Sequence, residues 1–435
     1  MKKVNKLIDS KITLIIMVFL FLGPLFDLAT SLLINVVKIN FNFVILIKML
    51  FMAILVYYVF FISKNKQKII YLLLIFIYMI CSFIMTIEYK GTMASLDELQ
   101  NLFRNFFYPI NLICILDVYQ NKKFNIDSKK LSIILFTYIL LLFVPTITGT
   151  DFNSYAYSKT GSIGWFNSTN EIGAIISILL PFGVCNLLKI ENIIEKIIIF
   201  LISIFTYFSL GTKVPILSLG IVIGVYLIIY IVKLIKKKQK KLLLVISSAL
   251  IVLMFGMIIL VPKTSFYKNI IIHLEFLKID SIDDFANIHI IDHFVFSERV
   301  SFYTETKDKY LESSLSEKLL GIGYTEIDEK NLDEVKTIEM DYYDIFFRNG
   351  IIGFILFFIP YILVLKDIVI KLFKKLKNKL VIDYNLYLSI SLILILSLFS
   401  GHVITAPSVS IFCIIILIMT LKEDSDENSL SNSKL

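Results

Sequence analysis

Long apolar runs separated by short polar segments dominate the chain. Each run is about 18 to 25 residues long, which is enough for a helix to cross the hydrocarbon core of a bilayer. Because lipid offers the backbone no hydrogen-bond partners, every run is expected to be a helix. The pattern predicts an all-α polytopic membrane protein with about twelve transmembrane helices, at residues 12–36, 42–62, 68–87, 100–119, 131–149, 168–188, 194–210, 213–235, 242–261, 342–365, 384–402 and 404–421.

Composition agrees with this pattern. Hydrophobic residues make up 57% of the chain and the mean hydropathy is +0.82, which excludes a soluble protein. The net charge of +8 comes from lysines in short clusters between apolar runs. We attribute that charge to membrane orientation and expect no nucleic-acid partner. Four cysteines lie inside apolar segments without metal-binding spacing and are expected to pack in the core: Cys81, Cys114, Cys185 and Cys413.

The basic clusters also predict the orientation of the chain. If every run crosses the membrane once, the strongly basic connections all fall on one side. Positive loops face the cytoplasm, so that side and both termini are predicted to be cytoplasmic. The basic start of the chain lacks a small-x-small cleavage site, which favours an uncleaved first span. The clusters are Lys64, Lys66 and Lys68; Lys122, Lys123, Lys129 and Lys130; Lys236, Lys237, Lys238, Lys240 and Lys241; and Lys371, Lys374, Lys375, Lys377 and Lys379.

Four parts are expected along the chain. Residues 1–261 hold helices one to nine, and residues 342–421 hold helices ten to twelve. Between them, residues 262–341 form a large extracytoplasmic cap with 17 acidic against 9 basic residues, whose apolar positions predict short amphipathic helices lying on the bundle. Residues 422–435 are polar and are predicted to be a disordered cytoplasmic tail. We find no similarity between the two halves, which weakens an inverted-repeat transporter.

The segment IEMDYYDIFFRNGIIG, where the cap runs into an apolar helix, is the candidate active site. Ionisable groups at the mouth of a membrane span need mutual pairing or a polar ligand. Glu339 and Asp341 precede the predicted helix without a local charge partner. One of them, partly desolvated, is expected to have a raised pKa and to act as a general base. Asp344 and Arg348 are spaced i to i+4, so they either neutralise one another or join the site.

Two cations are candidates for binding an anion. Lys213 follows the tight turn SLGTKVP and either extends toward lipid headgroups or faces a phosphate beside the helix start after Gly211. Arg299 lies in FSERVSFY. It either pairs locally with Glu298 or Glu305, or uses its planar fork for bidentate contact with a diphosphate.

Two further polar positions lie at predicted span ends. Asn170 follows Trp165 in GWFNSTNEIG, a segment that is either an interfacial anchor with a helix N-cap at Ser168 or Thr169, or a polar rim for a ligand. His402 in SGHVITAPS is either a helix-end cap or a second active-site group. No pair of histidines has the spacing of a metal site, so no metal is expected.

Five segments in order resemble the O-antigen ligase and polymerase family of integral-membrane glycosyltransferases, in the form found in Gram-positive capsule and teichuronic-acid clusters. They are GWFNSTNEIGAIISILLP, SLGTKVPILSLG, SERVSFY with LLGIGY downstream, EMDYYDIFFRNGIIGF and GHVITAPSVS. The segments lie between residues 160 and 410, while the first five spans match only in hydropathy. The resemblance implies a GT-C-like fold.

The resemblance also implies roles for particular residues. In the ligases, a histidine before the glycine pair is the acceptor-activating base, and Glu339 stands at that position here. This departure means either a glutamate base or a different acceptor or chemistry. Arg299 matches the family's Ser-x-Arg, and Lys213 stands where the family often has arginine. In the family such cations hold the diphosphate of a polyprenyl-linked donor, without metal or cofactor.

The expected function is a polymerase of surface polysaccharide. It would transfer polyprenyl diphosphate-linked oligosaccharide to the growing chain on the outer face of the plasma membrane. The alternatives are a ligase attaching polysaccharide to a cell-surface acceptor and a flippase or transporter of the same lipid-linked oligosaccharide. Expected partners are the lipid-linked donor, the bilayer, and a flippase and chain-length regulator of the same pathway.

Overall fold

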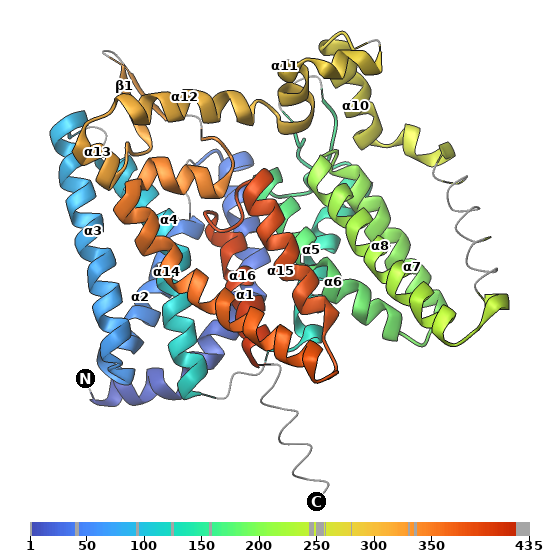
Figure 1. Ribbon diagram of the computed structural model, residues 1–435, viewed down its shortest axis with the longest axis horizontal. Coiled ribbons are helices and arrows are strands. Elements are labelled where there is room, and N and C mark those ends of the chain that lie inside the picture. Colours follow the sequence, from blue (N-terminus) through green and yellow to red (C-terminus); the bar gives the residue numbers. More distant parts are fainter. Residues whose placement is uncertain are drawn as a thin grey trace, which may run out of the picture. The chain divides into compact units, whose positions relative to one another are not determined.

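The computed structural model describes residues 2–39, 43–92, 95–122, 126–155, 159–242, 248, 256, 258–279, 281–328, 331–334 and 337–422 (Figure 1). The described residues are mostly helical and group into two compact units. Unit 1 comprises Met1–Thr30, Ile39–Asp127 and Val295–Leu435. Unit 2 comprises Ser31–Lys38 and Ser128–Phe294.

Unit 1 contains both ends of the described chain and the segment that the sequence singled out. Its elements are α1 (Lys2–Asn35, whose last residues belong to unit 2), α2 (Phe43–Tyr57), the π-helical turn η1 (Tyr58–Ser63), α3 (Lys66–Lys90), α4 (Ser95–Asn121), α12 (Arg299–Glu312), α13 (Leu315–Leu320), β1 (Thr325–Asp328), β2 (Asn331–Glu334), α14 (Asp341–Lys377), α15 (Tyr384–Phe399) and α16 (Pro407–Lys422).

Among its described residues, unit 2 contains four long helices and the first part of the expected cap. Its elements are α5 (Ser128–Thr148), α6 (Thr169–Lys189), α7 (Ile193–Ser209), α8 (Lys213–Lys236), η2 (Val261–Lys263), α10 (Ser265–Phe276), η3 (Ile282–Ala286) and α11 (Ile288–Ile291). The turn η4 (Asp292–Phe296) follows at its boundary.

The helices agree with a polytopic membrane protein. Among the described residues, seven helices are long and apolar enough to cross a membrane: α1, α2 with η1, α3, α5, α6, α8 and α14. The shorter α15 and α16 are also apolar. The expected spans at 100–119 and 194–210 form α4 and α7. The expected span at 242–261 lies mostly outside the described residues, as does nearly all of the expected tail at 422–435.

Each unit has one helix that is buried nearly throughout. In unit 1 this is α16, buried from Ser408 to Ile418 and packed against α4, α14 and α15. In unit 2 it is α6, which packs against α5 and α8. Outer helices instead expose apolar stripes at helical spacing, which is typical of lipid-facing helices. The stripe on α3 consists of Ile70, Leu73, Ile77, Ile80 and Ile84.

The helix α14 is interrupted at Gly350, which has φ 64° and ψ −175°. The interruption removes the preceding carbonyls from the helical hydrogen-bond ladder, so they need other donors. The loop after α13 and a tyrosine of α3 supply them: Ile322 N–H donates to Phe347 O (3.1 Å), Gly323 N–H to Arg348 O (3.1 Å) and Tyr78 Oη to Asn349 O (2.8 Å).

Two glycines allow this close approach. A Cβ atom on Gly321 would lie 2.0 Å from Arg348 O, and one on Gly350 would lie 2.4 Å from Gly321 N. Both glycines also have positive φ, which a side chain disfavours. The sequence motifs LLGIGY and RNGIIG therefore form one interlock that fixes the end of the cap to α14.

The structure of the cap agrees only in part with the predicted set of short helices. The helices α10 to α13 fit the expectation, but β1 and β2 pair as an antiparallel hairpin directly after the interlock, with Ile327 opposite Leu332.

Candidate active site

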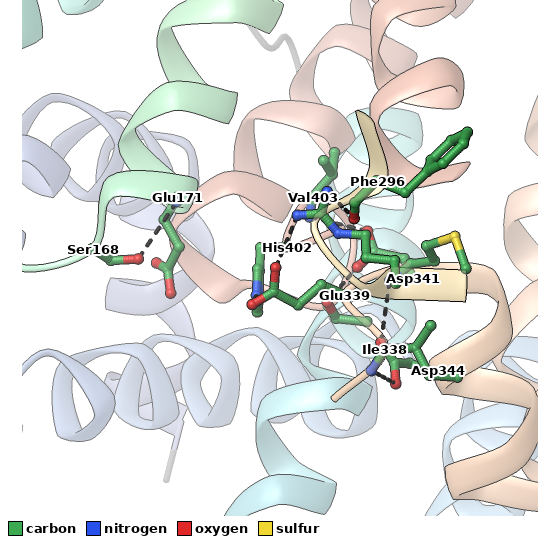
Figure 2. A network of polar contacts seen from close by, with 12 residues as sticks. Ser168, Glu171, Phe296, Ile338, Glu339, Asp341, Asp344, His402 and Val403 are labelled. Carbon is green, nitrogen blue, oxygen red and sulfur yellow. Dashed lines mark hydrogen bonds and ion pairs between the residues drawn. The ribbon is translucent and has the colours of Figure 1, made fainter. Parts of the chain in front are cut away.

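The start of α14 meets the loop after α15 inside unit 1 (Figure 2), and a buried acid joins them. Asp341, the first residue of α14, is 1% exposed. Its Oδ2 accepts the N–H groups of Val403 (3.0 Å) and Ile404 (2.9 Å), and its Oδ1 accepts the hydroxyl of Thr405 (2.7 Å). With three donors directed at one carboxylate, Asp341 anchors this loop to α14.

A second buried acid fixes the residues around Glu339. Asp344 accepts the N–H of Ile338 through Oδ1 (3.0 Å) and that of Met340 through Oδ2 (3.3 Å). Glu339, between them, has φ 59°. The left-handed region costs a non-glycine residue about 1–2 kcal/mol. Because both neighbours are held by one carboxylate, the direction of the Glu339 side chain is set by the fold.

The end of α15 is shaped to bring His402 beside Glu339. Gly401 donates its N–H to Leu396 O (3.0 Å) and has φ 63°, the usual conformation of a glycine after a helix C-terminus. His402 follows with φ 55°. A Cβ atom on Gly401 would lie 2.3 Å from Glu339 O. The two backbones therefore touch, and this contact positions the imidazole.

Glu339 lies between the guanidinium of Arg299 and the imidazole of His402. Arg299 Nη2 donates to Glu339 Oε2 at 2.8 Å, and His402 Nε2 lies 3.6 Å from Oε1. Figure 2 shows the Glu339 carboxylate next to His402. Arg299 opens α12 and also donates through Nη1 to Phe296 O (3.4 Å). The sequence left open whether Arg299 pairs locally with Glu298 or Glu305 or contacts a diphosphate. In the structure its carboxylate partner is Glu339, 40 residues away. We call these three residues the Arg299–Glu339–His402 cluster.

The cluster makes Glu339 a stable anion. Burial raises the pKa of the Glu339 carboxyl, but the interactions with His402 and Arg299 outweigh burial and hold the pKa at about 2. The sequence predicted a raised pKa for either Glu339 or Asp341. For Glu339 this prediction is wrong, because its pKa is lowered. The side chains remain partly accessible, with 31% of Glu339 and 23% of His402 exposed. Asp341, by contrast, is enclosed.

The other candidate cation lies in unit 2. Lys213 opens α8, donates through Nζ to Phe294 O and lies 4.7 Å over the Phe294 ring. His273 packs on the same ring, with 5.4 Å between centroids. Burial, together with the charges of Lys159, Lys213 and His293, lowers the pKa of His273 to about 4. We call Lys159, Lys213 and His293, whose charges act on His273, the cationic cluster of unit 2.

An asparagine that the sequence did not single out shapes the turn before Lys213. Asn269 of α10 donates to Gly211 O (2.9 Å) and Thr160 O (2.6 Å) and accepts the N–H of Thr160 (2.7 Å). Gly211 has φ 72°, and a Cβ there would lie 2.5 Å from Thr160 O. The turn thus requires glycine, as its sequence suggested. Nothing in the sequence of α10 pointed to Asn269.

The remaining candidates have local or structural contacts. Ser168 caps α6 by accepting the N–H of Glu171 (3.5 Å), which confirms the predicted N-cap. Asn170 is exposed in the first turn of α6. Arg348 is 3% exposed and donates through Nη1 to Gly323 O (3.1 Å). Within the described ranges, no group of three or more His, Cys, Asp or Glu could hold a metal ion.

A buried ion pair that the sequence analysis missed holds the loop after α13. Glu98 is 1% exposed. Its Oε1 accepts from Lys90 Nζ (2.8 Å), Tyr324 N (2.6 Å) and Thr325 N (2.8 Å). An acid in the first turn of α4 and a lysine in the last turn of α3 are ordinary helix-end residues, so no sequence signal marked them.

The fold and the site are those of a helical polytopic membrane protein with a charged cluster at the start of the apolar helix α14. A family model described as O-antigen ligase like membrane protein matches residues 9–289 and 288–424. Because these matches cover most of the chain, the protein belongs to this family. Searches of curated proteins and of solved structures find no match. Membership implies a glycosyltransferase-type activity, as polysaccharide ligase or polymerase, on a lipid-linked oligosaccharide in the membrane.

Proposed function

We propose that the protein is a polymerase of surface polysaccharide acting on the outer face of the cell membrane. The donor is a polyprenyl diphosphate-linked oligosaccharide, and the acceptor hydroxyl belongs to the growing chain. The observation that carries the proposal is the Arg299–Glu339–His402 cluster, which gathers a guanidinium, a carboxylate and an imidazole at the start of α14. Glycosyl transfer from a diphosphate needs a cation for the leaving group and a base for the acceptor.

Arg299 is suited to the leaving diphosphate. Its guanidinium is held by Glu339 and by Phe296 O, so it is positioned before the ligand arrives. Its buried Nε has no hydrogen-bond partner among the described residues, so the guanidinium keeps an unused donor. A preorganised cation stabilises charge that develops on the departing oxygen. No metal or cofactor takes part in the proposed reaction.

Lys213 supports anion binding within unit 2. The cationic cluster there creates a positive potential strong enough to contribute to the lowered pKa of His273. We assign Lys213 to a phosphate group bound within unit 2. Asn170, exposed at the N-terminus of α6, is assigned to a polar rim within the same unit.

Exposed side chains of α14 and α12 support contact with lipid and with sugar. Beyond the break at Gly350, α14 exposes an apolar stripe consisting of Ile351, Ile355, Ile359 and Ile362. Such a stripe suits lateral access of a polyprenyl chain from the bilayer. Near the start of α14, the exposed Tyr343 meets Tyr303 of α12 with ring centroids 5.0 Å apart. Tyrosine rings at an accessible surface are suited to stacking on sugars.

The charges of α14 support a site on the outer face. The last turn of α14 carries Lys374, Lys375 and Lys377. Because basic helix ends usually face the cytoplasm, we assign the opposite end, where the cluster lies, to the outer face. We favour a polymerase over a ligase because the motifs have the form found in Gram-positive clusters, for which a lipid A core acceptor is not expected.

The experiment supplies purified protein in lipid with polyprenyl diphosphate-linked repeat units and a metal chelator, and resolves products on a gel. We expect a ladder of lengths that disappears in Arg299→Ala. Lys309→Ala, which removes an exposed cation of the same helix, should leave the ladder unchanged. A single addition to a separate surface acceptor would instead indicate a ligase. Donor crossing between vesicle leaflets without product would refute glycosyl transfer and indicate a flippase.

A further inference from the structure

We infer that His402 is the catalytic base that takes the proton of the acceptor hydroxyl, and that Glu339 is the residue that positions it. The inference rests on the glycosyl transfer proposed above and specifies which member of the Arg299–Glu339–His402 cluster receives the proton.

The geometry of Glu339 argues against a base at this carboxylate. Oε2 accepts a charge-assisted hydrogen bond from Arg299 at 2.8 Å, and Oε1 faces His402 Nε2 at 3.6 Å. A carboxylate that accepts a charge-assisted hydrogen bond from a guanidinium is stabilised in its ionised form and is a weak base. The low pKa of Glu339, about 2, agrees with this placement.

The two neighbouring acids are already engaged. Both oxygens of Asp341 accept hydrogen bonds from the loop after α15, and those of Asp344 accept the N–H groups on either side of Glu339. Protonating either one would break contacts that hold the cluster together. Both are also buried, with 1% and 6% exposed, which keeps an acceptor sugar away from them.

His402 has the placement of a base. An imidazole whose Nε2–H is directed at a carboxylate carries its basic lone pair on Nδ1. The same carboxylate stabilises the imidazolium that forms when the proton arrives. Charged groups around His402 include Glu339 from the loop before α14, Asp344 of α14, Asp341, which accepts the N–H of the next residue Val403, and, behind the Glu339 carboxylate, Arg299 of α12. The carboxylates favour a transient positive charge on the ring, and the guanidinium opposes it.

The backbone supports the same reading. Glu339, Gly401 and His402 all have positive φ, and Gly401 touches the Glu339 backbone. The left-handed conformations of Glu339 and His402 are uncommon for non-glycine residues, and such conformations cluster at functional sites. Histidine is among the residues that tolerate this region, as asparagine is. The contact with the Glu339 carboxylate is specific to the imidazole side chain.

The proton transfer accompanies one substitution at the anomeric carbon of the donor. The acceptor hydroxyl oxygen attacks that carbon and forms the new glycosidic C–O bond. The C–O bond to the diphosphate breaks, and its electron pair stays on the diphosphate oxygen. The hydroxyl proton moves to His402 Nδ1 and is later released to water. The products are the elongated chain and polyprenyl diphosphate.

The test uses two substitutions matched to the left-handed backbone. His402→Asn keeps a side chain that tolerates φ 55° but removes the base. His402→Gly also tolerates this φ and leaves room for imidazole added to the buffer. We expect His402→Asn to lower the rate of ladder growth about 10²- to 10⁴-fold. Added imidazole should restore part of the rate in His402→Gly only. His289→Asn, the same substitution at an exposed position of α11, should change nothing.

The pH dependence separates a base from a structural residue. The wild-type rate should fall toward acid pH, because an imidazolium cannot accept the proton, and His402→Asn should lose that dependence. Glu339→Gln should move the acid fall to lower pH, since the imidazole loses the anion that stabilises its protonated form.

Four outcomes overturn the inference. A ladder in the wild type with an unchanged rate and pH profile in His402→Asn refutes it alone. A complete loss in Glu339→Gln, with activity kept in His402→Asn, assigns the base to Glu339. No ladder in the wild type refutes the proposed function and the inference with it. If His402→Asn does not fold, as judged by its elution from a sizing column, absence of imidazole rescue in His402→Gly decides against His402.

Discussion

The buried carboxylate of Asp341 offers a direct test of how the site is held together. In Asp341→Ala the N–H groups of Val403 and Ile404 lose their acceptor inside the protein. A buried unpaired N–H costs about 1–3 kcal/mol. Two of them give an expected loss of about 2–6 kcal/mol in the free energy of unfolding. The hydroxyl of Thr405 can rotate toward another acceptor, so we add nothing for it.

Asp341→Asn should cost less than Asp341→Ala. An amide keeps one acceptor oxygen but turns an NH₂ group toward at least one of the three donors, so we expect a loss of about 1–3 kcal/mol. Asp308→Ala is the control, because Asp308 is exposed on α12. A surface substitution of this kind changes stability by about 0.5 kcal/mol or less.

Unfolding of protein in lipid or detergent can be followed with a thiol-reactive dye. Cys114 and Cys413 are buried and become reactive as the helices separate. We expect the unfolding midpoints to fall in the order Asp308→Ala, Asp341→Asn, Asp341→Ala. The reasoning would be refuted if Asp341→Ala were as stable as Asp308→Ala. It would also fail if Asp341→Asn kept full stability and lost all activity, because Asp341 would then be the base and not the anchor.

Two further predictions concern the same cluster. The pKa of Glu339 lies at about 2, below the ordinary value of 4.5. Its ionisation therefore stabilises the fold above about pH 4.5, and this contribution is lost as the pH falls toward about 2. The unfolding midpoint of Glu339→Gln should fall less than that of the wild type across this window, and an equal fall would contradict the pairing. Gly401→Ala should lower activity and stability together, because its Cβ would overlap the Glu339 backbone at 2.3 Å and its φ is 63°. Gly220→Ala, where nothing lies within 4 Å, is the control, and a fully active Gly401→Ala would argue against the close contact.

The helices were predictable because a membrane span leaves a simple signal. Length and hydropathy alone located α1, α3, α5, α6 and α8 near their observed positions. The N-cap at Ser168 was predictable as well, since it depends on residues three apart. Such features are local, and local sequence determines them.

The contacts of the site were predictable only in outline. The charged residues around the start of α14 indicated the position of the site. The pairing of Arg299 with Glu339 was not predictable in this way, because it joins residues 40 apart. Glu339 and Asp341 looked alike in sequence. Their different roles depend on which backbone donors the folded chain brings to each, and those donors come from distant segments such as Val403 and Ile404.

The backbone packing between distant glycines could not be predicted from a sequence pattern either. The sequence predicted a continuous span at 342–365, and nothing in it indicated the break at Gly350 or the contact of Gly350 with Gly321. The Lys90–Glu98 pair holds the same loop from a third segment. A loop stabilised by three separate segments is a property of the tertiary fold, and each contributing residue alone has an ordinary helix-end or turn composition.

The exchange of a family histidine for Glu339 fits the geometry of the cluster. Proton transfer depends on where the imidazole nitrogen lies and not on which helix carries it. Here the left-handed turn at Gly401 and His402 places an imidazole 3.6 Å from the carboxylate that occupies the family position. A carboxylate at that position both binds Arg299 and stabilises the imidazolium of His402. A second histidine would do neither. The departure at Glu339 is therefore compatible with the same reaction, with the base supplied from the end of α15.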